Sequence, residues 1–269
     1  MLGSSRESLV ALRASLDARS AEPGFPSVSG DLLAVAGVLG REKSLRQMLA
    51  DSGQQEASRI GIVTSLFGGK ISPEASSVLV DVVKTRWSSD ADLVDAVEIL
   101  GAQAAFATAQ RDGSLDRVEA ELFSFGQALD TSPELQMALT DPSQTSEGKA
   151  ALVRDLVGST ASPVTTSLLV HLAGNLRGRR PASAVEELAR LAADERQRLL
   201  AEVRAAVALT PEQEQRLAAA LSRLQGREVR VNVILDPEVV GGIVVRVGDD
   251  VIDGSVASKL ENARRTVGV

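Results

Sequence analysis

The sequence predicts a mainly α-helical protein with a small α/β domain at its C-terminal end. Over most of the first two hundred residues, apolar residues recur three or four positions apart, which places them on one helix face. Short turns between these segments indicate an antiparallel bundle. Val229–Leu235 and Ile243–Val247 are instead rich in β-branched residues and are typical of strands. The clearest helical stripe consists of Leu115, Val118, Leu122, Phe125 and Leu129.

Residues 1–90 contain a partial copy of the helical segment that follows them. Residues 90 positions apart are identical or similar over about 35 positions without a gap. Convergent helical patterns would place matching leucines, but they would less easily place glycine and Ser-Pro breakers in the same register. We therefore infer an internal duplication. The matching pairs include Leu45 with Leu135, Leu49 with Leu139, Asp51 with Asp141, Gly68 with Gly158, Ser72 with Ser162, Pro73 with Pro163, and Leu79 with Leu169.

The main bundle follows this copy. Its first helix is predicted over residues 93–110 and its second over residues 115–129, with a short turn at residues 111–114 between them. Pro181 begins a later helix, because proline is favoured at the first helical position. The sequence therefore predicts a series of antiparallel helices up to about residue 200.

The small domain begins after residue 200. Residues 202–207 alternate polar and apolar side chains only loosely, so they either extend the preceding helix or form a strand. Thr210 and Pro211 then begin a helix, in which threonine is the cap and proline takes the first position. Gln213 reaches back to complete a capping box.

The stretch from residue 236 to residue 255 is the most specific part of the sequence. Its turn residues, glycines and β-branched residues predict a small hairpin that leads into a last helix. In order, these are a turn at Asp236 and Pro237, a bend at Gly241 and Gly242, a strand containing Arg246, a return strand ending at Asp253, a stop at Gly254, a cap at Ser255, and a helix over residues 256–267.

This stretch closely resembles the C-terminal signature of the delta subunits of F-type ATP synthases, called OSCP in mitochondria. Many residue types recur in order over about twenty positions, so the match is specific. The signature defines a fold and contains no catalytic chemistry. The residues that carry it are Asp236, Pro237, Gly241, Gly242, Arg246, Asp253, Gly254 and Ser255.

The resemblance implies a helical bundle followed by a βαββα domain, with a strand at residues 202–207. The implied domains are an extension over residues 1–90 that partly repeats the bundle, the bundle over residues 91–200, and the α/β domain over residues 201–269. Long delta chains of this kind resemble those of actinobacteria, and the alanine- and arginine-rich composition agrees with this.

Composition excludes several kinds of function. The chain has no cysteine, which removes disulfides, zinc–thiolate sites and cysteine nucleophiles. Its net charge is −7 and it has one Trp and no Tyr, which argues against nucleic-acid binding. No apolar run approaches 18 residues, and polar residues near the N-terminus interrupt any signal-peptide pattern. We expect membrane association only through a partner.

Three patterns could suggest catalysis or a metal site, but each has a simpler explanation. Gly68, Gly69 and Lys70 lack the Ser or Thr and the earlier glycine of a phosphate loop, so a loop after a helix is preferred. His171 is the only histidine, which excludes a three-histidine metal site and favours a bundle residue. The third pattern is an acidic group that consists of Asp249, Asp250 and Asp253. It lacks the regular oxygen ligands of a calcium loop, so turn residues and a helix cap are preferred.

Two further features remain open from the sequence. A basic cluster before Pro181 either lies in a solvated loop near a helix C-terminus or contacts an acidic partner; it consists of Arg177, Arg179 and Arg180. Trp87 either packs where the extension meets the bundle or anchors a partner, since tryptophan is enriched at binding hot spots.

The resemblance implies a mechanical function. A delta subunit is a stator component that links the catalytic head to the peripheral stalk, so we expect no catalytic residue, no cofactor and no metal. Implied partners are the N-terminal segments of alpha subunits and a b-type stalk subunit, at the cytoplasmic face of the cell membrane.

The implied groove for the alpha segment involves the helices over residues 93–110 and 163–176. Its candidate contact residues are Leu93, Val97, Leu168 and Leu172. Two alternatives are a helical adaptor unrelated to ATP synthase, which co-purification with ATPase subunits would test, and an enzyme with an unrecognised site.

Overall fold

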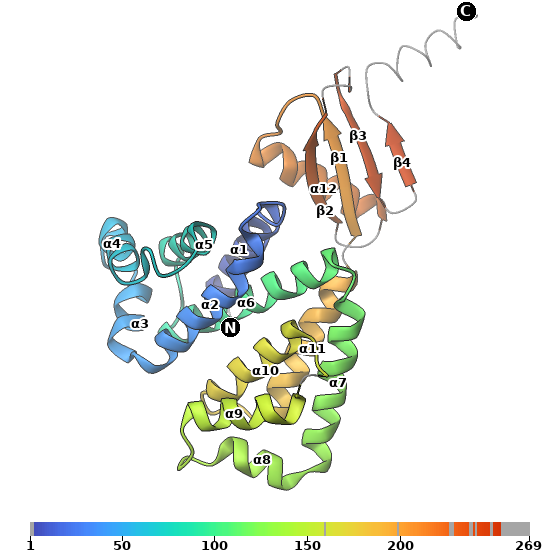
Figure 1. Ribbon diagram of the computed structural model, residues 1–269. Helices are drawn as coiled ribbons and strands as arrows, with labels where there is room; N and C mark the ends of the chain where they lie inside the picture. The colour runs from blue at the N-terminus through green and yellow to red at the C-terminus, as the bar shows by residue number, and fades with distance from the viewer. Residues whose placement is uncertain are drawn as a thin grey trace, which may run out of the picture. The chain divides into compact units, whose positions relative to one another are not determined.

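The computed structural model describes residues 3–158, 160–197, 199–225, 229–236, 239, 241–247 and 250–253 (Figure 1). The chain divides into two compact units, Met1–Glu195 and Arg196–Val269. The first unit is helical, and the second combines a helix with a sheet. This confirms the predicted fold class. No helix among the described residues is long and apolar enough to cross a membrane.

The helical unit consists of consecutive helices, several of which begin at a capping serine or threonine or at a proline. Ser72, Ser89 and Ser162 each accept a hydrogen bond from a backbone N–H in the first helical turn. The helices are α1 (Ser4–Ala18), α2 (Phe25–Arg41), α3 (Lys43–Ala50), α4 (Glu56–Phe67), α5 (Pro73–Lys84), α6 (Asp90–Arg111), α7 (Leu115–Thr131), α8 (Pro133–Thr140), α9 (Ser146–Val157), α10 (Pro163–Gly174) and α11 (Pro181–Gln197).

The helix bounds repeat at the offset seen in the sequence. Adding 90 to the bounds of α2, α3, α4 and α5 gives the bounds of α7, α8, α9 and α10. The two copies also share a hydrogen bond. In each copy, the backbone N–H of the serine before the fifth helix donates to a carboxylate on the second helix. Ser72 N–H donates to Asp31 Oδ2 at 2.8 Å, and Ser162 N–H donates to Glu121 Oε2 at 2.9 Å. Helices α1–α5 thus form a first copy, and α6–α10 a second copy, of one helical pattern.

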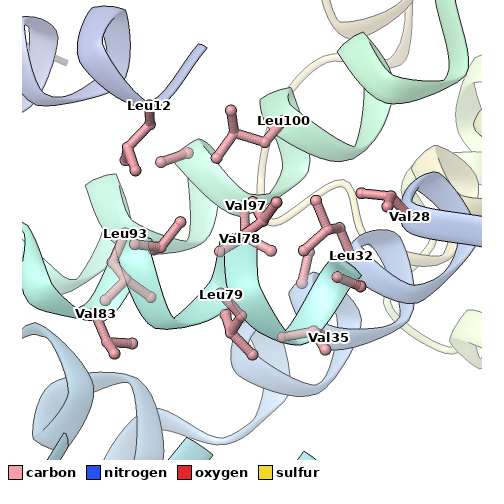
Figure 2. Packing of buried hydrophobic residues seen from close by; sticks show 14 of the residues in the cluster. Leu12, Val28, Leu32, Val35, Val78, Leu79, Val83, Leu93, Val97 and Leu100 are labelled. Carbon is pink, nitrogen blue, oxygen red and sulfur yellow. The ribbon is translucent and has the colours of Figure 1, made fainter. Parts of the chain in front are cut away.

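Helix α6 is shared by two apolar clusters. The first cluster joins it to α1–α5. Figure 2 shows residues of α1, α2 and α5 packed around Leu93, Val97 and Leu100 of α6. The second cluster joins it to α7–α11 through residues such as Phe106, and it also takes in Leu33 of α2. The predicted boundary near residue 90 coincides with the start of α6. The separation of residues 1–90 from 91–200 as domains stays a prediction.

Within its described residues, the second unit consists of a four-stranded mixed sheet and one helix. The strand order is β2-β1-β3-β4; β1 pairs with β2 in parallel and with β3 in antiparallel, and β3 pairs with β4 in antiparallel. Val203, Leu221 and Val245 are among its core residues. The elements are β1 (Leu199–Ala205), α12 (Pro211–Gln225), β2 (Val229–Leu235), β3 (Ile243–Val247) and β4 (Asp250–Asp253).

Residues 202–205 of the ambiguous segment form the end of strand β1, and residues 206 and 207 lie beyond the strand. The strand begins earlier than expected, because its residues from Leu199 onward pair with those of β2 from Val229 onward. The predicted capping box at Thr210 is also present: its hydroxyl accepts from Gln213 N–H, and the Gln213 side chain accepts from Thr210 N–H at 2.8 Å. The helix predicted over residues 256–267 lies outside the described residues.

Candidate partner-binding site

The four residues predicted to contact a partner are all buried, and the structure does not bring them into one group. Leu93 and Val97 on α6 belong to the first cluster. Leu168 and Leu172 on α10 belong to the second cluster. Of the four, Leu172 lines a groove, and it is 5 % exposed. A partner contact at these four residues stays a prediction. The groove beside Leu172 is the surface at which such a contact is considered below.

This groove, the α6 groove, has a volume of about 270 Å³ and lies within the helical unit. It is bounded by α1, α6, α10 and α11. Acidic and basic side chains, including Arg6 and Glu187, accompany an apolar lining. Mostly apolar pockets with a few placed polar groups are typical of binding sites. The main apolar residues are Leu9, Ile99, Leu172, Ala184, Leu188 and Leu191.

A cluster of ion pairs around Glu98 joins α6 to the loop between α10 and α11 at the edge of this groove. The Glu98 carboxylate accepts hydrogen bonds from Arg177 and, at 2.7 Å, from Arg179 Nη2. Arg177 also pairs with Asp95 at 2.7 Å. His171 Nε2 lies 3.5 Å from Glu98 Oε1. Two guanidinium groups therefore hold one buried carboxylate, which fixes the loop against α6.

The environment of Glu98 keeps it ionised. Burial by itself raises the pKa of this carboxyl, but the His171 ring and the charges of Arg179 and Arg177 outweigh it. The net result is a pKa lowered from 4.5 to about 2. The carboxylate is thus charged throughout the neutral range. Glu98 is the partner of Arg177 and Arg179, two residues of the basic cluster for which the sequence allowed either a solvated loop or a contact with an acidic partner.

In the first copy, the loop after α5 is bound to α1 in the same way, but through neutral groups. Ser5 Oγ accepts from Ser88 N–H at 2.8 Å, and Ser8 Oγ donates to the Arg86 carbonyl at 3.0 Å. Ser5 and Ser8 are 90 positions before Asp95 and Glu98. Both copies therefore tie the loop after their fifth helix to their first helix, and only the second uses charge.

Trp87 packs inside the chain. It lies 90 positions before Arg177, is 6 % exposed and belongs to the first cluster. Its indole N–H donates to the Val82 carbonyl at 2.9 Å. A buried indole with a satisfied N–H packs the junction between the copies. At the matching position of the second copy, Arg177 has a positive φ of 50°. This conformation is strained for a residue with a side chain, and its two carboxylate partners hold it.

The residues considered for catalysis or metal binding take structural positions. Gly68 is the C-cap of α4. His171 lies on α10 beside Glu98. Asp250 and Asp253 are the ends of β4, and Asp249 lies outside the described residues. Within the described ranges, no group of three His, Asp or Glu side chains could hold a metal ion.

The signature residues that the structure describes lie in the strands of the sheet and in the turns beside them. Asp236 follows β2, and its N–H donates to the Ala205 carbonyl at 3.0 Å. Gly241 and Gly242 have φ values of 69° and 80°, which explains why glycine is needed there. Arg246 lies opposite Glu202 of β1. Asp253 ends β4, whereas Pro237, Gly254 and Ser255 lie outside the described residues.

The sequence did not point to most residues of the α6 groove. Ile99 and Ala102 are on a helix that is buried on nearly every side, so no single apolar stripe identifies its exposed part. Leu188 and Leu191 continue the apolar pattern of α11. That pattern predicts a buried face, but it does not show where the face is left uncovered.

Comparisons with known proteins agree on one family. The family profile "ATP synthase delta (OSCP) subunit" matches residues 101–267. ATP synthase subunit delta of Streptomyces coelicolor is 44 % identical over 267 residues, covering 98 % of this chain and 97 % of that protein. The same subunit of Streptomyces griseus is 42 % identical over 267 residues, covering 98 % of each chain. That of Nocardia farcinica is 40 % identical over 269 residues, covering 98 % and 99 %. The relatives thus span both copies, whereas the profile begins within α6.

Proposed function

Because the chain belongs to the delta (OSCP) subunit family of ATP synthases, we propose that its α6 groove binds the N-terminal segment of an alpha subunit. In this family the subunit is a non-catalytic component of the peripheral stalk, the stator of the rotary enzyme. Membership of this family excludes the two alternatives that the sequence analysis considered, which were an unrelated helical adaptor and an enzyme. The finer question is which surface holds which partner.

The lining of the α6 groove supports an apolar helical ligand. Ile99 and Leu9 are partly buried at the groove, and Leu188 and Leu191 continue the apolar lining on α11. An amphipathic helix places apolar residues on one face, which suits a groove of this kind. The charged residues around it, including Arg6 and Glu187, would contact the polar flanks of that helix.

The small residues of the lining support this choice of groove. Ala102 on α6 and Ala184 on α11 leave space beside the larger apolar residues of the lining. The residues 90 positions earlier are the larger Leu12 and Val94. The observation that carries the proposal is therefore the apolar lining of the α6 groove.

For the α/β unit, the proposed partner is the C-terminal helix of a b-type stalk subunit. Apolar side chains are exposed on this unit: Val207 and Leu224 are each 71 % exposed and Leu235 is 61 % exposed. Exposed apolar side chains of this size are candidates for a protein contact. Held between the head and the stalk, the chain would be a peripheral component at the cytoplasmic face of the membrane.

The alpha-segment proposal is tested by one substitution with a matched control. Ile99→Arg places a cation in the α6 groove and is expected to weaken binding of a synthetic alpha-subunit N-terminal peptide at least tenfold, measured by calorimetry with the full chain. Val10→Arg, at a residue of α1 that is 62 % exposed and outside the groove lining, is expected to leave the affinity unchanged. Equal affinities for all three chains, with unchanged circular dichroism, would place the peptide elsewhere.

A further inference from the structure

The loop between α10 and α11, residues 175–180, contacts both copies of the helical pattern. We call this loop the strap. On one side it is bound to Glu98 of α6 through Arg177 and Arg179. On the other side it lies against Gly40 of α2, where an added Cβ would be 3.4 Å from Arg177 Cδ. The strap is therefore a point at which the first copy touches the edge of the α6 groove.

Glycines on α2 permit this close approach. Gly37 is buried, and a Cβ added there would be 3.4 Å from Asn175 Oδ1 of the strap. The positions of α7 that match Gly37 and Gly40 carry larger residues, and both are exposed; they are Gln127 and Asp130. Glycine lets a neighbouring segment come close where a side chain would keep it away. The first copy thus has small residues at the two positions that contact the strap.

Arg177 is held in a backbone conformation that is unfavourable for it. Its φ is 50°, and within the described part of the chain no other residue that carries a side chain has a positive φ. Its guanidinium binds two carboxylates of α6, Asp95 at 2.7 Å and Glu98. Unfavourable conformations persist where the surrounding contacts enforce them, so the loss of such contacts would let the strap relax.

Arg179 connects the strap to the opposite wall of the groove. Its Nη2 donates to Glu98 Oε1 on α6 at 2.7 Å, and its Nη1 is 4.0 Å from Glu187 Oε2 on α11. Its Nε donates to the Leu176 carbonyl at 3.1 Å, which ties the side chain to the strap backbone. Arg179, Glu98 and Glu187 all line the α6 groove. One side chain thus links both walls, and its position depends on that of the strap.

We propose that the strap is a conformational latch through which the first copy sets the width of the α6 groove. While α2 holds the strap, Arg177 keeps its positive φ and Arg179 connects α6 with α11. When the contact with α2 is lost, Arg177 relaxes, Arg179 leaves Glu98 and the two walls separate. The latch thus has two discrete arrangements, as energetic coupling between separate segments requires. It is a property of the chain itself and goes beyond the binding of an alpha segment.

Hydrogen exchange of the full chain tests the latch, read by mass spectrometry on peptides that cover residues 175–180. Gly40→Leu adds a side chain where Arg177 lies, so the strap amides are expected to exchange at least tenfold faster than in the unsubstituted chain. Gly30→Leu is the matched control on the same helix, because Gly30 is exposed and an added Cβ meets no atom within 4 Å. Equal strap exchange in all three chains would overturn the proposal.

The matching loop of the first copy, residues 85–89, shows whether the effect is local. Its peptides are expected to keep their exchange rate in Gly40→Leu. Emission of Trp87, the sole tryptophan and a buried one, should also stay unchanged if the first copy remains folded. Gly40→Ser places a smaller side chain at the same point and is expected to give an intermediate strap rate. Faster exchange of both loops in both variants would reveal general loosening and overturn the latch.

The width of the groove provides a second readout. The chain has no cysteine, so two introduced cysteines can be spin-labelled without background. Glu7→Cys on α1 and Arg190→Cys on α11 place labels at exposed positions next to lining residues of the groove. The distance between the labels, measured by pulsed electron paramagnetic resonance, is expected to be longer and more broadly distributed in Gly40→Leu than in Gly30→Leu. A faster strap with an unchanged distance would reject its control of the groove.

The latch and the alpha site fail separately, because these measurements use the chain without a peptide. Unchanged strap exchange in Gly40→Leu would reject the latch and leave the alpha site standing. Undiminished peptide affinity in Ile99→Arg would reject only the alpha site.

Discussion

At the scale of single residues, Glu98 is the most consequential polar side chain of the helical unit. It is 8 % exposed and binds two arginines from a loop about eighty residues later in the chain. Removing one member of a buried ion pair leaves the others desolvated without compensation. The loop that closes one end of the α6 groove therefore depends on this single carboxylate.

Replacing Glu98 with glutamine is expected to destabilise the helical unit by about 3 kcal/mol, because Arg177 and Arg179 lose their shared charge partner. The measurement is urea unfolding at pH 7, followed by circular dichroism. Glu187→Gln is the control: this carboxylate is 4.0 Å from Arg179 and its side chain is 42 % exposed, so a change below about 0.5 kcal/mol is expected. Similar losses for the two variants would contradict the special role of Glu98.

The lowered pKa of Glu98 also predicts how this contribution depends on pH. Because the folded-state pKa of about 2 is below the ordinary value of 4.5, the stabilisation is complete above about pH 4.5 and disappears as the pH falls towards 2. The shift corresponds to about 3 kcal/mol. Unfolding free energies of the wild type and Glu98→Gln should therefore converge on acidification. A difference that stays constant from pH 7 to pH 2.5 would exclude this explanation.

At the scale of helices, the close contact between α2 and α6 depends on Gly101. A Cβ added there would lie 3.0 Å from the Leu33 side chain and 3.3 Å from its backbone nitrogen. Leu33 is 4 % exposed, so it has little room to move. The glycine thus permits the first copy to pack directly on the helix that begins the second.

Gly101→Ala is expected to destabilise the chain by about 1–2 kcal/mol, since overpacking outweighs the better helix propensity of alanine. Gly61→Ala is the matched control within α4, where an added Cβ meets no atom within 4 Å. This control is expected to stabilise the chain by up to about 1 kcal/mol. Thermal unfolding of the two variants measures the difference, and stabilisation by both would show that the α2–α6 contact is loose.

Helices that begin with local signals were predictable. Ser162 and Pro163 start α10, and the Thr210 capping box starts α12, because caps and prolines act on their own turn. Strand β1 was ambiguous because its alternation is weak, and its length is set by pairing with β2 and β3. The Glu98 cluster and the α6 groove depend on helices distant in sequence, which local patterns do not encode.

At the scale of the whole molecule, the repeat was visible in the sequence, but the sharing of α6 was not. A duplication is equally compatible with two separate bundles and with two copies that have a helix in common. The structure has one compact helical unit, Met1–Glu195, with two clusters meeting on α6. Burial on nearly every side of α6 hides the apolar stripe that would have assigned it to one copy.

Deleting residues 1–88 is expected to uncover one side of α6. Leu93, Val97 and Leu100 are all 0 % exposed and would lose their contacts with α1, α2 and α5. The remaining chain should therefore expose apolar surface and self-associate. Size-exclusion chromatography with light scattering measures this. A monomeric truncated chain with undiminished affinity for the stalk would show that the first copy is dispensable.

The shared helix also determines how this protein would respond to tension. If two bundles were joined by a flexible linker, the linker would extend first and the bundles would then unfold one after the other. Here the first copy cannot come away without stripping one side of α6, and the second copy needs that helix for its own core. A pull that separates α6 from either copy is therefore resisted by the cores of both copies.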